Sequence, residues 1–164
     1  MRPLMALLVV AGCGGSGGTT STGTTGTTSD PAAQHNLDVL NMYRAQNNAP
    51  ALVLSSDLNQ FAITGTQDLA GGGSAHAHFM AASNDGSIWK SGFCGGAGEN
   101  QAPGWPLNPD ENGTIDAILK AMMDEGPGGG HHDNIVNPNY RMVGVGLVVQ
   151  GGLYLTNDFS NACN

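Results

Sequence analysis

Two pairs of histidines are the side chains with the clearest capacity for chemistry. His76 and His78 form one pair, and His131 and His132 form the other, each in a polar or glycine-rich stretch. A neutral imidazole nitrogen and a glutamate oxygen both suit zinc, so such groups brought together by loops could bind a divalent cation. They could instead form a hydrogen-bonded network in which each carboxylate orients an imidazole and holds it charged. Because loop histidines are more often surface residues than ligands, the pairs alone do not define a site.

Motifs for other kinds of catalysis are absent or lack the context that they need. The sequence has no phosphate-binding loop, no H-E-x-x-H and no C-x-x-C motif. Residues 14–18 satisfy the G-x-S-x-G pattern of hydrolase nucleophiles, which requires a strand, a turn and a helix. Residues 14–29, however, contain only Gly, Ser and Thr, a composition typical of a flexible coil. Cofactor enzymology therefore has no support in the sequence.

The first residues have the order of a bacterial export signal. A basic residue precedes the apolar run 4–10, and two small residues precede Cys13. The apolar run is too short to span a membrane, which takes roughly 20 residues as a helix. Residues 10–13 resemble the lipobox, whose cysteine is acylated and becomes the new N-terminus. We therefore predict a signal peptide over 1–12.

A flexible tether and a folded domain are expected to follow. We predict that residues 13–33 form the lipidated cysteine and its linker, and that residues 34–164 form the domain. This domain would lie outside the cytoplasm, anchored to the bacterial cell envelope by the lipid on Cys13. The formal net charge of −8 repels phosphate backbones and anionic headgroups. Nucleic acid is therefore not an expected partner, and membrane attachment must come from the lipid itself.

The chain has three cysteines, an odd number for an exported protein. If Cys13 carries lipid, Cys94 and Cys163 remain. In an oxidising compartment, two cysteines most simply form one disulfide. The loop that this bond would close is long enough to stabilise the fold by about 4 kcal/mol.

Helices are expected first along the chain and strands last. Capping residues and apolar residues at helical spacing predict helices from Asp30 to near Asn48, from Ser55 or Ser56 to Gly71, and from a cap at Thr114 to Gly126. Residues 74–109 are expected to be mostly loops, with a short strand around 99–102. Two β-rich runs, 143–149 and 153–159, are separated by a hairpin signal. This order predicts an α+β domain with an antiparallel sheet covered by helices.

Several motifs, taken in order, resemble those of the CAP family, which includes cysteine-rich secretory proteins, insect venom antigens and plant pathogenesis-related proteins. The resemblance covers about residues 34–160 and is strongest in the bacterial G-H-x-x-N-I-L-N-P-x-Y segment. The motifs that carry it are 40–44 with 50–52, 76–79, 98–102, 130–140 and 143–146. It implies a three-layer α-β-α sandwich and a central cleft lined by two histidines and two acidic residues.

The resemblance implies which residues line the cleft. Glu99 matches the first acid, Glu125 the second acid and His131 the second histidine. The first histidine is either His76 or His78, and we prefer His78 because Phe79 follows it. Two departures affect the expected geometry: His78 lies further from Glu99 in sequence than in many relatives, and the gap between Glu125 and His131 is short. His132 is a further candidate for the cleft.

Three kinds of function fit these residues. We expect a non-catalytic module that binds a small apolar ligand or an envelope protein, because some eukaryotic members of the family bind sterols and lipids. The alternative is a peptidase-like, metal-assisted hydrolase in which Glu99 or Glu125 activates water held by His78 and His131, with zinc or another divalent cation as the metal. A third possibility is a purely structural envelope protein in which the four residues only hold loops together.

Overall fold

Residues 30–163 are the part of the chain that the computed structural model describes. The predicted signal peptide, the lipidated Cys13 and nearly all of the predicted linker lie outside these residues. Within the described residues, no helix has both the length and the apolar content needed to cross a membrane.

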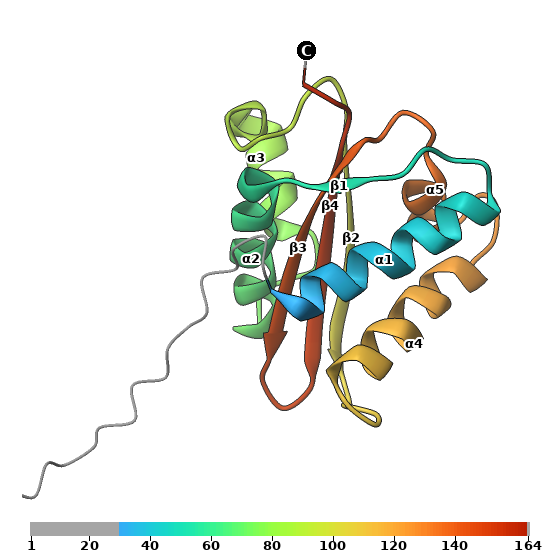
Figure 1. The fold of residues 1–164 in the computed structure, drawn as a ribbon. Coiled ribbons are helices and arrows are strands. Elements are labelled where there is room, and N and C mark those ends of the chain that lie inside the picture. Colours follow the sequence, from blue (N-terminus) through green and yellow to red (C-terminus); the bar gives the residue numbers. More distant parts are fainter. Residues whose placement is uncertain (1–29, 164) are drawn as a thin grey trace, which may run out of the picture.

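A four-stranded sheet forms the middle layer, with strand order β1-β3-β4-β2 (Figure 1). β1 runs parallel to β3, whereas β3 with β4 and β4 with β2 are antiparallel. The sheet is therefore mixed but mostly antiparallel, and β2 is an edge strand. The strands are β1 (Val53–Leu54), β2 (Ala97–Trp105), β3 (Met142–Val149) and β4 (Leu153–Ser160).

Helices cover both faces of the sheet (Figure 1). One face carries α1 (Pro31–Gln46), α4 (Glu111–Asp124) and α5 (Gly130–Val136). The other face carries α2 (Ser56–Ala70), α3 (Ala77–Asp85) and the 3-10 helix η1 (Ser87–Lys90). This arrangement confirms the predicted three-layer α-β-α sandwich.

Capping side chains set where the helices begin. Asp30 caps α1 as predicted, since its carboxylate accepts a hydrogen bond from Ala32 N at 2.9 Å. α4 begins earlier than predicted, because the carboxylate of Asp110 accepts from Gly113 N at 2.9 Å. Thr114 lies inside the helix and donates its hydroxyl to the Asp110 carbonyl oxygen at 2.7 Å. The expectation that Thr114 caps this helix is therefore wrong.

Residues 74–109 contain more regular structure than the sequence indicated. They include α3, η1 and the whole of β2. β2 contains Gly98, Pro103 and Gly104, residues that are typical of loops. An edge strand accepts them because one of its sides makes no ladder hydrogen bonds, and the register shifts between Ala102 and Trp105, around the proline. The prediction that this segment is mostly loop is wrong for this reason.

Glycines on one face of β3 allow α2 to pack closely on the sheet. Side chains alternate along a strand, so Gly144 and Gly146 face α2 whereas Val143 faces the opposite core. A Cβ atom at Gly144 would lie 2.2 Å from the Leu58 carbonyl oxygen, and one at Gly146 would lie 2.3 Å from that of Ala62. The V-G-V-G segment therefore forms a flat surface that no larger side chain could provide.

Arg44 joins the C-terminal end of α1 to the segments around α5 and before β1 and β3. Its side chain is completely buried, and its partners are backbone carbonyl oxygens. The guanidinium donates to Pro50 O at 2.7 Å, Ile135 O at 2.6 Å, Asn137 O at 3.1 Å and Tyr140 O at 3.0 Å. Burial lowers the pKa of Arg44 to about 10, which leaves the group charged at neutral pH.

A disulfide joins Cys94 and Cys163, as predicted. The bond links the segment before β2 to the C-terminal end of the chain, and the two cysteines are 69 residues apart in sequence. A covalent link across a loop of this length stabilises a fold by about 4 kcal/mol in the chain-entropy model.

Replacing Gly146 by alanine should lower the free energy of unfolding by about 3 kcal/mol, because the new Cβ would force α2 away from the sheet. The control is Gly65→Ala within α2, where a Cβ would meet no atom closer than 3.6 Å. That variant should be as stable as the wild type or up to about 1 kcal/mol more stable, since alanine favours helix. Denaturant unfolding followed by circular dichroism measures both. Equal stability of Gly146→Ala and the wild type would contradict the close packing.

Replacing Arg44 by lysine should lower the free energy of unfolding by about 2–5 kcal/mol. One ammonium group cannot reach four carbonyl oxygens that point at a planar guanidinium, so some of them would remain buried without a donor. Arg141→Lys is the matched control, since Arg141 donates to Pro138 O at the surface. The same unfolding measurement applies, and a loss no larger than that of the control would contradict this role for Arg44.

Candidate functional site

A cavity of about 250 Å³ opens at the edge of the sheet beside β2. The residues around it come from both helix layers, because no further strand covers this edge. His76 immediately precedes α3, Glu99 lies in β2, Glu125 follows α4 and His131 lies in α5. The lining residues are His76, Glu99, Glu125, Gly130, His131 and Asn134.

His76 and Glu99 form the first pair in the cavity, with His76 Nδ1 and Glu99 Oε1 2.8 Å apart. The Glu99 side chain is only 1% exposed, whereas that of His76 is 39% exposed. Burial raises the pKa of Glu99, and the hydrogen bond with His76 opposes this rise. His76 has a left-handed backbone, with φ of 63°, and its N–H donates to Gln101 Oε1 at 2.6 Å. This bond to Gln101 supports a backbone conformation that is uncommon for a residue other than glycine.

His131 and Glu125 form the second pair. Their Nδ1 and Oε1 atoms are 2.5 Å apart, and the other carboxylate oxygen accepts from His131 N at 3.1 Å. The hydrogen bond with His131 lowers the pKa of Glu125. The short gap between these residues is closed by a tight turn, in which Gly126 and Gly128 have φ values of 71° and 93°. The glycine-rich sequence between α4 and α5 therefore brings the second carboxylate to its histidine.

Two asparagines tie β2 to α5. Asn100 is fully buried and donates from Nδ2 to His131 O at 3.0 Å. Asn134 donates from Nδ2 to Asn100 Oδ1 at 2.9 Å and to Glu99 O at 3.2 Å. Both amides thus bond backbone carbonyl groups. Their effect is to hold the helix that carries His131 against the strand that carries Glu99.

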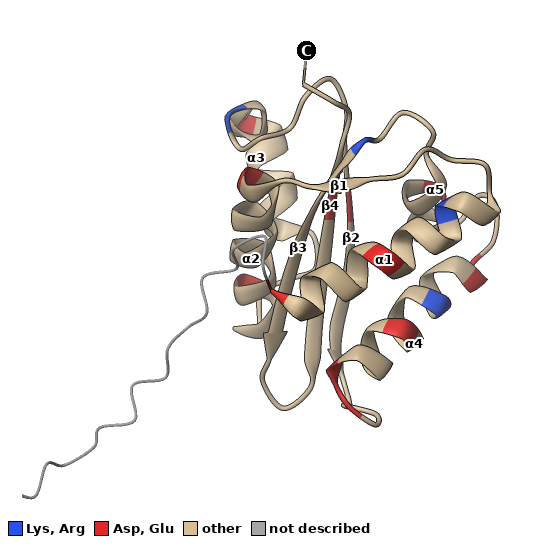
Figure 2. Ribbon diagram, viewed as in Figure 1, with Lys and Arg blue, Asp and Glu red and all other residues tan. Residues whose placement is uncertain are grey.

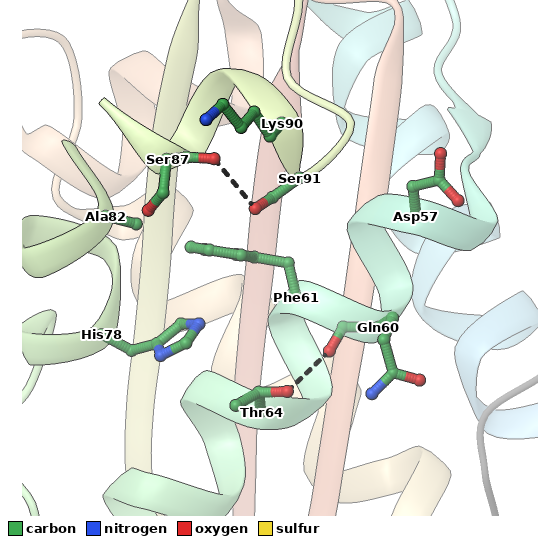
Figure 3. Close-up of a pocket in the computed structure, with 9 residues that line it drawn as sticks. All are labelled: Asp57, Gln60, Phe61, Thr64, His78, Ala82, Ser87, Lys90 and Ser91. Carbon is green, nitrogen blue, oxygen red and sulfur yellow. Dashed lines mark hydrogen bonds between the residues drawn. The ribbon is translucent and has the colours of Figure 1, made fainter. Parts of the chain in front are cut away.

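His78, which the sequence favoured as the first cleft histidine, lies in a different cavity (Figure 3). This cavity has a volume of about 430 Å³ and lies among α2, α3 and η1. The His78 ring packs on Phe61, with centroids 4.4 Å apart, and Nδ1 is 3.5 Å from Asp68 Oδ2. His76 lies just before α3, whereas His78 lies within the helix, so the two imidazole rings point in different directions. The structure brings His76, not His78, to the Glu99 carboxylate.

The pair His78 and His131, predicted as tentative metal ligands, is likewise not brought together around one cavity. His132 lies in α5 next to His131, but it is largely buried and does not line the cavity. Its Nδ1 is 3.1 Å from Asp133 Oδ1. Four of the six predicted cleft residues therefore meet: His76, Glu99, Glu125 and His131.

A second, more apolar cavity of about 170 Å³ adjoins the first. Glu125 and His131 line both cavities. No motif in the sequence indicated this cavity, because its walls come from segments that are far apart in the chain. The lining residues are Gln101, Ala102, Pro103, Trp105, Ile118, Ala121, Met122, Glu125 and His131.

The geometry agrees with a family match. Residues 37–159 match the model described as the cysteine-rich secretory protein family, CAP. The chain belongs to the CAP family. The resemblance inferred from the motifs is thereby confirmed.

Solved structures with the same fold include bacterial CAP proteins. An extracellular protein containing an SCP domain from Bacillus anthracis is 25% identical, with a TM-score of 0.59, over 79% of this chain and 40% of that one. A cysteine-rich secretory protein from Staphylococcus aureus is 15% identical, with a TM-score of 0.58, over 80% of this chain and 39% of that one. The CAP domain of enterococcal PrgA is 19% identical, with a TM-score of 0.52, over 78% and 59%. No curated protein matches the chain in sequence.

The first two of these solved proteins are much longer than the matched region, which spans about 40% of their length. What they share with this chain is the CAP domain. Their remaining parts have no counterpart in the match, so the fold carries over but the activity of the whole protein does not.

The cavity of this CAP domain offers two imidazole nitrogens but not a complete set of zinc ligands. Among residues 30–163, no three His, Cys, Asp or Glu side chains lie close enough together to hold a metal ion. A catalytic zinc normally has three protein ligands. Each carboxylate here bonds the Nδ1 of a histidine, as groups that orient a ligand do, so the residues present do not fit a zinc site by themselves. The predicted divalent cation therefore stays a prediction.

Replacing Asn100 by alanine should lower the free energy of unfolding of the CAP domain by about 1–3 kcal/mol, since buried polar groups lose a partner. It should also speed amide hydrogen exchange in α5, because the bond to His131 O is lost. Asn139→Ala is the control, because Asn139 is exposed and lies shortly after α5. Hydrogen exchange in α5 that matches the control would contradict the role of Asn100 in holding this helix.

Proposed function

We propose that the chain is an exported, lipid-anchored CAP domain that binds a small, largely apolar ligand at the bacterial cell envelope. The ligand's polar group lies in the His/Glu cavity, between the imidazoles of His76 and His131. Its apolar part lies in the adjoining cavity, against Trp105 and Met122. In this proposal the domain binds its ligand without transforming it.

The observation that carries the proposal is that Glu125 and His131 line both cavities. Ligand sites commonly combine an apolar wall with a few well-placed polar groups. Here the polar groups have their positions set in advance, because each imidazole is bonded through Nδ1 to a carboxylate. The Nε2 side of each ring is left for a ligand.

Export is supported by several independent features. The first residues have the order of a lipoprotein signal, and the disulfide between Cys94 and Cys163 is typical of proteins outside the cytosol. The similar protein from Bacillus anthracis is extracellular. The acidic chain is not attracted to anionic lipids, so in this proposal attachment depends on the lipid on Cys13.

Binding is favoured over hydrolysis by the residues that line the cavity. Among these six residues there is no serine, threonine or cysteine that could act as a nucleophile. A hydrolase would therefore need Glu99 or Glu125 as a general base for water. Both carboxylates already accept hydrogen bonds from a histidine, which suits an orienting role better.

We expect the wild-type domain to retain apolar compounds from a bacterial lipid extract, identified by mass spectrometry after washing. Ala121→Trp should reduce retention about tenfold, the factor that corresponds to 1.4 kcal/mol, because the indole fills the mouth of the apolar cavity. Ala121 is exposed, so this change should leave the fold intact. Ala81→Trp, at an exposed position on α3, is the matched control and should retain the same compounds.

Other results from binding, activity and stability measurements would favour other functions. Turnover of a broad peptide or ester panel that Glu99→Gln abolishes would identify a hydrolase and overturn the proposal. Retention of nothing, together with lower melting temperatures for variants of the four cleft residues, would indicate a purely structural role.

A further inference from the structure

Asp158, in the middle of β4, is a buried carboxylic acid without a hydrogen-bonding partner. It has no exposed surface. Within residues 30–163, neither of its carboxyl oxygens has a hydrogen-bonding partner, and the same is true of Glu99 Oε2. Three buried carboxyl oxygens are thus unpartnered, although buried polar atoms in native proteins are almost always bonded.

The register of the sheet places the two residues that carry these oxygens next to one another. Asp158 lies directly opposite Glu99 of β2 on one side and Gly144 of β3 on the other. Directly opposite residues on antiparallel strands have Cβ atoms about 4.5–5.5 Å apart and point to the same face. That face is covered by α2, since Thr156, two residues before Asp158, bonds Thr66 of α2 at 2.8 Å. Figure 2 shows acidic segments on the neighbouring strands β4 and β2.

The elements packed around this pair bring no lysine or arginine to it. β3 contributes Gly144 at this register, and α2 presents Gly65 to Glu99, since a Cβ there would lie 3.7 Å from Glu99 Oε2. The titratable groups on the surrounding segments are the exposed Asp57 and Asp68 of α2, and His76 and His78 at the start of α3. His76 bonds the other oxygen of Glu99, and His78 contacts Asp68. Two adjacent buried carboxyl groups in such surroundings cannot both be ionised.

We propose that Asp158 keeps its proton at neutral pH and donates it to Glu99 Oε2, and that Glu99, as the ionised partner, accepts the Nδ1–H of His76. The three groups then form a chain that runs from the buried sheet to the cavity. Asp158 is a positioning residue in this chain, since it acts on the cavity only through Glu99. One proton shared by the two carboxyl groups thus gives a partner to Glu99 Oε2 and to one of the two oxygens of Asp158.

The electrostatics of the two acids agree with this placement of the proton. Burial raises the pKa of Asp158 well above its usual value, and the charge of Glu99 raises it further. Burial also raises the pKa of Glu99, but the hydrogen bond and charge of His76 act in the opposite direction. Glu99 is therefore the member of the pair that ionises first.

The arrangement also determines what the cavity can recognise. When His76 donates through Nδ1 to Glu99, its neutral imidazole presents a lone pair at Nε2. The ligand group that meets this atom is then a hydrogen-bond donor, such as a hydroxyl group. This consequence rests on the proposed function, whereas the position of the proton can be measured with no ligand present.

Infrared spectroscopy of the whole domain at neutral pH tests where the proton lies. We expect a band from the C=O stretch of a protonated carboxyl group, and we expect it to shift when the aspartate carboxyl carbons carry ¹³C. Asp158→Asn should remove this band, whereas Asp38→Asn, at an exposed position on α1, should keep it. If the wild type lacks the band at neutral pH, or if the band shifts only with glutamate labelling, the proposal is wrong.

The pH dependence of stability gives a second test. A carboxyl group whose pKa is raised on folding stabilises the fold fully below its unfolded pKa, about 3.9 for aspartate, and this contribution is lost as the pH rises towards the folded pKa. Asp158→Asn cannot ionise, and its amide can donate to Glu99 in place of the proton. Relative to the wild type, its melting temperature should therefore rise by about 3 °C or more between acidic and neutral pH. A constant difference across this range would contradict the proposal.

The nitrogen resonances of the His76 side chain, assigned with His76→Gln, test the part of the hydrogen-bonded chain that faces the cavity. Under conditions in which the imidazole is neutral, we expect Nδ1 to carry the hydrogen and Nε2 the lone pair. The opposite tautomer would overturn the proposal. A failed lipid-retention experiment would leave these three measurements unaffected, so the two hypotheses can fail separately.

Discussion

Arg44 carries a positive charge into the interior, where backbone carbonyl oxygens take the place of water. Those carbonyls belong to the loop before β1, the C-terminal end of α5 and the segment between α5 and β3. Removing the charge from water is costly, and the cost is recovered only if all of these segments keep their places. α5 is too short to hold its own position, yet it carries His131. The geometry of the candidate site thus depends on Arg44, although Arg44 does not line the cavity.

The site also depends on β2 being the last strand of the sheet. With no neighbour on its outer side, β2 lets a turn from one helix layer and a short helix from the other meet around its edge. Successive side chains of β2 point to opposite faces of the sheet, so they contact different helix layers. Glu99 and Gln101 face the α2 side and hold His76, whereas Asn100 faces the other side and holds α5. One strand therefore positions both halves of the cavity.

Much of this architecture could be predicted because the signals are local. The caps and apolar periodicity of α1 and α2, and the glycine-separated strands at the end of the chain, act over a few residues. β2 was mostly missed because its glycines and proline are typical of loops, and they are tolerated only at a sheet edge, which a sequence does not reveal. The sequence favoured His78 over His76, because the left-handed turn that directs the His76 ring towards Glu99 depends on a bond to Gln101, which is distant in sequence. Asp158 gave no signal at all, since its significance comes from the register that sets it beside Glu99.

The disulfide has a mechanical consequence for a domain held by its N-terminal side. Tension applied there enters through α1 and can extend the chain only as far as Cys94, since beyond that point Cys94 and Cys163 cannot separate. β2, α4, α5, β3 and β4 all lie inside this covalent loop. α1 and α2, in contrast, lie on the path of the load, with the buried guanidinium of Arg44 as the first strong point of resistance. The loop that encloses Glu99, Glu125 and His131 would thus be shielded from stretching while the segments before Cys94 bear the tension.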